Sequence, residues 1–235
     1  MSDDTEAYEH AARIEAQFTA QAEAFAASPA LHAAEALALM VDAAAPCASD
    51  AMLDVACGPG SVVAAFAPHV RTATGVDATE AMLEQARRLS AEKDLRNVAW
   101  VKSNVYSLPF VSETFDVVTC RFAFHHFEHP EAAFDEMLRL CKPGGRVVVC
   151  DGLASAIPAK AHALNEFERL RDPSTVAFRT LNYFRALFER MGASEPEIRF
   201  YKHPGTLSGL LKNSFPADGN LERLRALIEQ SVDGD

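Results

Sequence analysis

The sequence has no run of basic residues, and its 33 acidic side chains outnumber its 22 lysines and arginines. The formal net charge of −11 argues against nucleic acid as the main partner, because binding to a phosphate backbone requires clustered Lys and Arg. No apolar stretch approaches the roughly 20 residues that span a bilayer. The acidic N-terminal residues also contain no apolar segment typical of a signal peptide. We therefore expect a cytoplasmic protein without a membrane span.

Cysteine is scarce and shows no pairing pattern. The five cysteines are odd in number and include no C-x-x-C spacing; they are Cys47, Cys57, Cys120, Cys141 and Cys150. This predicts reduced, mostly buried thiols rather than a zinc site or a disulfide scaffold. With 49% apolar and 23% charged residues, the 235-residue chain has the composition of one ordinary globular domain.

Strand-like and helix-like segments alternate through the middle of the chain. We expect strands at 52–56, 72–77, 97–102, 115–121 and 145–151, with helices at 61–68, 79–92 and 131–141. This order predicts an α/β fold, a Rossmann-like, doubly wound, mostly parallel sheet with helices on both faces. Helices are expected upstream at 5–27 and, after Ser28-Pro29, at 31–45. We therefore divide one domain into an N-terminal arm (1–50), a core (51–151) and a lid with the end of the sheet (152–235).

A glycine turn follows the first predicted strand. Leu53 to Val55 is an apolar run, Gly58-Pro59-Gly60 indicates an abrupt turn, and Ser61 is placed to cap the next helix. Glycine lets the backbone approach a ligand closely, as in the first half of a nucleotide-binding βαβ unit. The third small residue of a dinucleotide fingerprint is absent, since Val63 stands in its place.

Polar residues also end the second and third strands. Asp77 has the position of a carboxylate that accepts hydrogen bonds from both hydroxyls of an adenosine ribose. The alternative is a helix capping box of Asp77 with Glu80. Asn104 presents an amide to an adenine edge, or is an ordinary turn asparagine.

Histidines and aromatic residues follow the fourth strand, in the segment from Arg121 to Pro130. We consider His125 or His126 a candidate catalytic base, because histidine takes up a proton near neutral pH. The alternative is that one of them is packed and satisfied by the backbone. His129 is expected to precede a helix that begins at Pro130. No metal site is expected on the histidines, since nothing in the sequence supplies a metal-ligand geometry.

Taken together, residues 50 to 151 resemble the class I S-adenosylmethionine-dependent methyltransferases, in the branch of the ubiquinone/menaquinone C-methyltransferases. The resemblance is carried by 53–60, 75–79, 108–110 with 115–118, 124–127 and 140–145. It implies S-adenosyl-L-methionine as cofactor and S-adenosyl-L-homocysteine as product. It also implies that the N-terminal helix closes over the cofactor. The segment Ser103-Asn104-Val105 departs from the family, many of whose members have an acidic residue there.

The resemblance assigns roles to individual residues. It implies that the methionine end is surrounded by Asp54, Ala56, Cys57, Gly58 and Gly60 and approached by Arg121 and Phe122. Asp77 would hold the ribose, and the adenine would be lined by Ala78, Met82, Asn104 and Val105. Aromatic faces suited to a cationic sulfur are offered by Phe18, Phe25, Phe122 and Phe124.

These features predict in-line methyl transfer to a small acceptor. Aromatic residues in the segment 153–190, expected to form a lid, favour an apolar or aromatic acceptor, although a helical pair covering the sheet explains them equally well. Two alternatives are an S-adenosylmethionine-binding protein without methyl transfer and an NAD-dependent oxidoreductase. The sequence leaves the oligomeric state open, a homodimer included. A sixth strand is expected at 195–202, whereas 206–235 reads mostly as helix, without the family's last strand.

Overall fold

The computed structural model describes residues 3–28, 32–190, 192, 196–202 and 206–232. Its centre is a five-stranded sheet in the order β3-β2-β1-β4-β5, and every neighbouring pair is parallel. The strands are β1 (Ala51–Val55), β2 (Thr72–Asp77), β3 (Val98–Lys102), β4 (Phe115–Arg121) and β5 (Cys141–Cys150). The predicted parallel α/β sheet is confirmed.

Helices cover both faces of the sheet, so every residue of β1 and all but one residue of β4 are buried. One face packs against α2 (Ala34–Ala44), α3 (Ser61–Phe66) and α4 (Glu80–Glu92) through Met40, Phe66 and Leu83. The other face packs against α5 (Pro130–Leu140) and α7 (Leu181–Glu189) through Phe134 and Leu187. Strands buried on both faces are typical of parallel sheets with helical crossovers.

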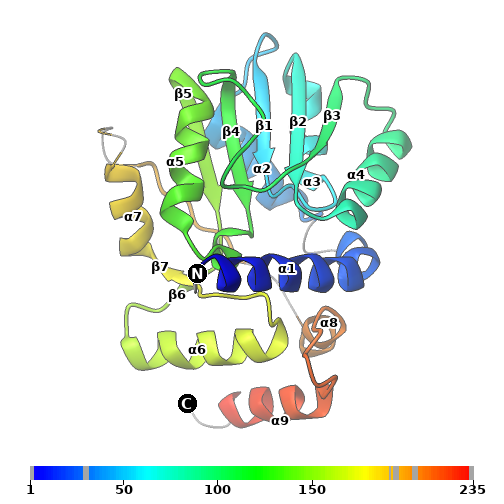
Figure 1. The fold of residues 1–235 in the computed structure, drawn as a ribbon, viewed down its shortest axis with the longest axis vertical. Helices are drawn as coiled ribbons and strands as arrows, with labels where there is room; N and C mark the ends of the chain where they lie inside the picture. Colours follow the sequence, from blue (N-terminus) through cyan, green and yellow to red (C-terminus); the bar gives the residue numbers. More distant parts are fainter. Residues whose placement is uncertain (1–2, 29–31, 191, 193–195, 203–205, 233–235) are drawn as a thin grey trace.

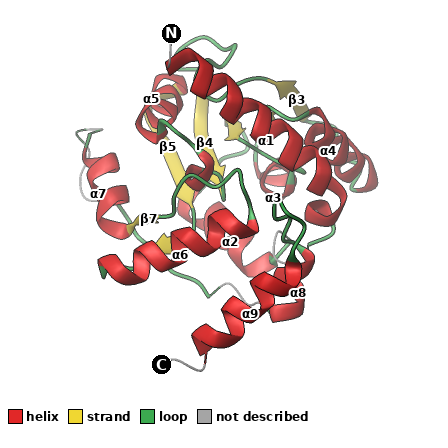
Figure 2. Cartoon of the chain, turned by 60° about the horizontal axis from the view of Figure 1, so that its bottom comes forward, coloured by secondary structure: helices red, strands yellow, loops and turns green. Residues whose placement is uncertain are grey.

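The remaining elements lie at the carboxyl ends of the strands. Helix α1 (Asp3–Ala26) crosses this end of the sheet, and α6 (Pro158–Arg171), α8 (Leu207–Lys212) and α9 (Leu221–Val232) lie beyond it (Figure 1). Figure 2 shows α6, α8 and α9 on the side of the molecule that carries the C-terminus. Gln17 of α1 donates a hydrogen bond to the carbonyl of Phe215 at 3.2 Å. The N-terminal and C-terminal segments therefore support each other over the strand ends.

Smaller elements complete the described chain. The short helices are η1 (Ala67–His69) and η2 (Phe124–His126), and β6 (Leu153–Ala154) pairs in parallel with β7 (Arg179–Thr180). Residues 153–190 thus hold the two helices α6 and α7 and a two-stranded ribbon. Among the described helices, none is both long and apolar enough to cross a membrane.

Three predicted boundaries differ from the structure. The sixth strand is wrong for residues 196–202, which form no strand, and residue 195 lies outside the described residues, as do Pro29 and Leu31. The second helix begins at Ala34. Strand β5 begins at Cys141 rather than at 145, with an irregular register opposite Phe115 to Val117. Gly144 within it has a φ of 76°, a left-handed conformation that favours glycine.

Candidate active site

A cavity of about 230 Å³ lies where the carboxyl ends of the strands meet α1. Of the residues predicted from the sequence as a cofactor or catalytic site, fourteen line it: Phe18, Phe25, Asp54, Ala56, Cys57, Gly58, Asp77, Ala78, Met82, Asn104, Val105, Arg121, Phe122 and His126. Gly60, Phe124 and His125 do not line it, and Phe124 is buried in the hydrophobic core instead. The strand ends therefore converge on one hollow, as expected for a parallel sheet.

The glycine turn between β1 and α3 depends on left-handed backbone. Gly58 has a φ of 51°, and Gly60 has a φ of 83° and is the N-cap of α3. A Cβ on Gly60 would lie 2.5 Å from the Trp100 ring. The need for glycine at this position is therefore explained by the packing between α3 and β3 and not by contact with a ligand. The prediction that Ser61 caps α3 is wrong, because Ser61 is already inside the helix and the N-cap makes no side-chain hydrogen bond.

Asp77, at the end of β2, holds the glycine turn in place. Its Oδ2 accepts the Gly58 N–H at 2.8 Å, and its Oδ1 accepts the Thr79 N–H at 2.9 Å. The predicted capping box with Glu80 is therefore wrong, since Thr79 is the N-cap of α4 and makes no side-chain cap bond. Burial raises the pKa of Asp77 although these hydrogen bonds oppose the rise. Each oxygen keeps acceptor capacity for a ligand in the cavity.

Asp54 is a second carboxyl group at the cavity, on β1. Its Oδ1 accepts a hydrogen bond from the Thr119 hydroxyl of β4 at 2.6 Å. Burial raises the pKa of Asp54 to about 7, against the effects of that hydrogen bond and of the Arg121 charge. The carboxyl group is thus poised to ionise near neutral pH, and a cation in the cavity would favour the ionised form.

Strained backbone also marks the ends of the two central strands. Ala56 after β1 has a φ of 54°, and Phe122 after β4 has a φ of 53°. Residues other than glycine rarely adopt this conformation, and both of these residues line the cavity. The Arg121 guanidinium lies 4.5 Å from the centre of the Phe122 ring, so a fixed positive charge lies at the carboxyl end of β4.

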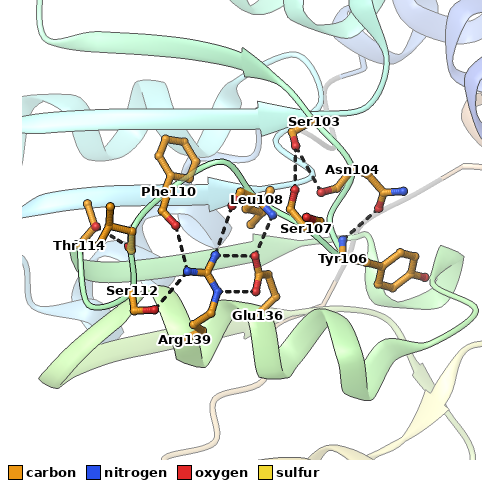
Figure 3. A network of polar contacts seen from close by, with 11 residues as sticks. Ser103, Asn104, Tyr106, Ser107, Leu108, Phe110, Ser112, Thr114, Glu136 and Arg139 are labelled. Atoms are coloured by element: carbon orange, nitrogen blue, oxygen red, sulfur yellow. Dashed lines mark hydrogen bonds and ion pairs between the residues drawn. The ribbon is translucent and has the colours of Figure 1, made fainter.

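The loop after β3 brings Asn104 and Tyr106 to the cavity. Asn104 Oδ1 accepts the Tyr106 N–H at 3.0 Å, which confirms the turn interpretation, and the residue also lines the cavity. Figure 3 shows how Arg139 of α5 holds this loop. Arg139 donates to the carbonyls of Leu108 and Phe110, while its ion-pair partner Glu136 accepts the Leu108 N–H at 2.8 Å.

Replacing Arg139 with Met is expected to loosen the loop that carries Asn104. The change removes two bonds to backbone carbonyls and leaves Glu136 without its cation, at a cost of about 1–3 kcal/mol in the free energy of unfolding. Urea denaturation measures that loss. Arg96→Met, on an arginine whose side chain is 85% exposed, is the control and should cost less than about 0.5 kcal/mol. Equal losses in the two variants would contradict a special role for Arg139.

The two adjacent histidines of η2 face different surroundings. His125 Nδ1 lies 2.7 Å from Asp151 Oδ1, and its ring stacks on Phe178 with centroids 4.2 Å apart. His126 lines the cavity and packs edge-on against Phe18, with centroids 5.0 Å apart. Burial lowers the pKa of His126 to about 3, so its imidazole is neutral at pH 7. Of the two candidates for a base, only His126 is at the cavity.

Sequence reasoning missed several residues that complete the wall. The cavity is also lined by His10, Ile14, Tyr106, Phe127, Glu128 and His129. His10 is buried, and its Nε2 donates to the His126 carbonyl at 2.8 Å. The sequence contained a signal for His10 and Ile14, because these two residues and Phe18 follow one another at intervals of four, the spacing of one helix face. Within the described part of the chain, no three potential metal ligands cluster.

Comparisons with known proteins agree with this geometry. Residues 53–149 match the family model described as "Methyltransferase domain". The relative named "Uncharacterized methyltransferase YcgJ", of Bacillus subtilis, is 34% identical over 87% of this chain and 81% of its own length. Its crystal structure superposes with a TM-score of 0.75 at 32% identity, covering 82% of each chain.

Two further relatives carry more specific names. The demethylmenaquinone methyltransferase of Clavibacter sepedonicus is 34% identical over 72% of this chain and 66% of its own length. The ubiquinone/menaquinone biosynthesis C-methyltransferase UbiE of Roseobacter denitrificans is 36% identical over 54% of this chain and 53% of its own length. The likeness to these two therefore covers only part of each relative.

Proposed function

Since the chain belongs to the methyltransferase-domain family and is an S-adenosylmethionine-dependent methyltransferase, we propose that it methylates a small, apolar or aromatic acceptor by in-line transfer. The cofactor supplies an activated methyl group on a sulfonium cation. The observation that carries the proposal is the single cavity shared by Asp54, Gly58, Asp77 and His126 beneath α1. A methyl group so activated needs positioning and exclusion of water more than it needs further chemical activation.

The residues at the cavity fit this cofactor. Asp77 presents a carboxylate with acceptor capacity left over on both oxygens, as two neighbouring ribose hydroxyls require. Asp54 offers a carboxyl group that ionises near neutral pH, next to the strained backbone of Ala56. In our proposal Asp77 holds the ribose, Asp54 and the glycine turn hold the methionine end, and Asn104 with Met82 faces the adenine.

The aromatic side chains that α1 contributes to the cavity wall suit a cationic sulfur. Phe18 and Phe25 of α1 meet edge to face with centroids 6.1 Å apart, and both line the cavity. The face of an aromatic ring attracts a nearby cation by about 0.5–2 kcal/mol. We propose that α1 shields the bound cofactor from water through these rings.

Replacing Phe25 with Leu tests whether these aromatic rings attract the sulfonium. The variant keeps an apolar side chain but removes the ring, so S-adenosylmethionine affinity should fall about 3- to 20-fold. Isothermal titration calorimetry with S-adenosylmethionine and with the uncharged thioether S-adenosylhomocysteine separates the two effects. A ring that attracts the sulfonium makes the loss larger for the cation. Equal losses for both ligands would contradict the electrostatic part and leave only packing.

The acceptor end of the cavity supports an apolar or aromatic substrate. Ile14, Phe18, Tyr106 and Phe127 line the cavity, and we propose that the acceptor lies against them. The names of two relatives place them in menaquinone or ubiquinone biosynthesis. We extend only the general class to this chain, a small molecule with an apolar body.

The experiment is a transfer assay with S-adenosylmethionine labelled in its methyl group. The purified chain is incubated with a panel of small acceptors that differ in aromatic, aliphatic and charged character, after calorimetry has measured cofactor binding. We expect label to move onto apolar or aromatic members. Binding followed by transfer only to highly charged acceptors would overturn the acceptor class, and absence of cofactor binding would overturn the whole proposal.

A further inference from the structure

A buried chain of polar groups leads from the loop after α6 to His126. Ser174 is fully buried, and Asp172 is 6% exposed. The Ser174 hydroxyl donates to Asp172 Oδ1, which also accepts the Ser174 N–H at 3.0 Å. Ser174 Oγ lies 3.1 Å from His126 Nδ1. The chain therefore runs from a carboxylate through a hydroxyl group to an imidazole that lines the cavity.

The direction of these hydrogen bonds follows from the number of protons available. Burial raises the pKa of Asp172, but the neighbouring His126, the hydrogen bonds from Ser174 and the charge of Arg171 together hold it low, so the carboxylate can only accept. The single hydroxyl proton of Ser174 is used on Asp172. The hydroxyl oxygen must then accept from His126, which places a proton on Nδ1 and leaves Nε2 as a lone pair.

The loop is held firmly enough to impose this arrangement. The N–H groups of Val176 and Ala177 both donate to the His125 carbonyl, at 2.8 and 3.1 Å. His10 of α1 donates to the His126 carbonyl. The backbone of η2 is thus held by two separate segments, and the His126 ring is oriented by Ser174 and by the edge-on contact with Phe18.

We propose that Asp172 and Ser174 are positioning residues that lock His126 as the Nδ1–H tautomer, so that Nε2 accepts the proton of a hydroxyl group on the methyl acceptor. This rests on the proposed function and narrows its substrate to hydroxylated apolar or aromatic molecules. The O–H bond breaks, its electron pair stays on the acceptor oxygen, and the proton moves to Nε2 and later to water. The oxygen that has lost its proton is the nucleophile, or feeds its electron pair into an aromatic ring that is.

The chemistry of the wall favours a hydroxyl group over an ammonium group. A hydroxyl group has one proton to donate, which matches one imidazole lone pair. A primary ammonium has three N–H donors, of which this lone pair accepts only one. Burial makes His126 a weaker base, and Asp172 and Ser174 oppose that effect by stabilising the positive charge that His126 gains with the proton.

The first test is spectroscopic and needs neither cofactor nor acceptor. In the histidine-¹⁵N-labelled wild-type protein near pH 7.5, His126 is expected to show a protonated Nδ1 and an unprotonated Nε2, with His126→Gln assigning the signal. Ser174→Ala removes the acceptor for Nδ1–H and should shift the tautomer ratio towards Nε2–H. Ser155→Ala, at a serine in residues 153–190 whose hydroxyl oxygen accepts the Ile157 N–H, is the matched control. A wild-type His126 in the Nε2–H form would overturn the proposal.

The second test is kinetic, and it separates an effect on proton transfer from the acceptor from an effect on cofactor binding. His126→Gln should keep S-adenosylmethionine affinity within about threefold and lower kcat on hydroxylated acceptors by about 100-fold or more. Ser174→Ala and Asp172→Asn should lower kcat about 10-fold with little change in KM. His162→Gln, on the exposed surface of α6, should leave both unchanged. Methylation of amines alone, or full activity of His126→Gln, would overturn the inference while cofactor binding and transfer still support the proposed function.

Discussion

Asp77→Ala is expected to weaken S-adenosylmethionine binding by about 100-fold or more. The carboxylate accepts the N–H groups of Gly58 and Thr79, so its loss frees the glycine turn as well as the ribose. A hydrogen bond to a charged group contributes about 1.5–3 kcal/mol, and two bonds to ribose hydroxyls therefore exceed the roughly 2.8 kcal/mol that corresponds to 100-fold. Calorimetry with the cofactor measures the change directly.

Two variants show whether the effect belongs to Asp77 itself. Asp77→Asn keeps the shape but places an amide nitrogen against one of the two backbone N–H donors, so it should lose nearly as much affinity as Asp77→Ala. Asp94→Asn, at an exposed carboxylate paired with Arg96, removes the same charge from the surface and should bind normally. A loss below about threefold in Asp77→Ala would show that the ribose is held elsewhere.

The place of Asp77 at the cavity was predictable because a parallel sheet brings the carboxyl ends of its strands to one edge. Asp54, which lies inside β1, was instead predicted from the resemblance to a known family. Gly60 shows the limit of that reasoning. Its position next to the turn suggested a ligand contact, whereas the structure has the Trp100 ring of β3 where a Cβ would stand. A packing partner 40 residues away leaves no trace in the local sequence.

The histidine pair could not be resolved from sequence for a similar reason. His125 and His126 are neighbours in a short helical turn, and their roles depend on partners distant in the chain. Asp151 after β5 binds His125, and Ser174 in the loop after α6 binds His126. The missing sixth strand reflects the same problem, because strand formation at 196–202 depends on pairing with β5 rather than on local propensity.

The second large effect is expected in the pH dependence of stability, and it depends on Asp54. Its pKa is about 7 in the folded protein and 3.8 when unperturbed, so between these values the folded state holds a proton that the unfolded state has lost. Stability contributed by this proton is present at low pH and decreases as pH rises towards 7, by about 4 kcal/mol at most. Asp54→Asn removes the titration and keeps an oxygen for the Thr119 hydroxyl, so it should be the more stable protein at pH 7.

The wild-type profile alone does not reveal this effect, because His126 acts in the opposite direction. Burial lowers the pKa of His126 to about 3, so its contribution to stability grows as pH rises towards 6.5. The difference between wild type and Asp54→Asn cancels that contribution. Urea denaturation at intervals from pH 4.5 to 7.5 should show the variant gaining on the wild type as pH rises, whereas the exposed-site variant Asp94→Asn follows the wild type throughout. Parallel curves for Asp54→Asn and wild type would mean that Asp54 is already ionised in the folded protein throughout this pH range. A carboxylate that is ionised without a bound ligand would have to be stabilised by Arg121.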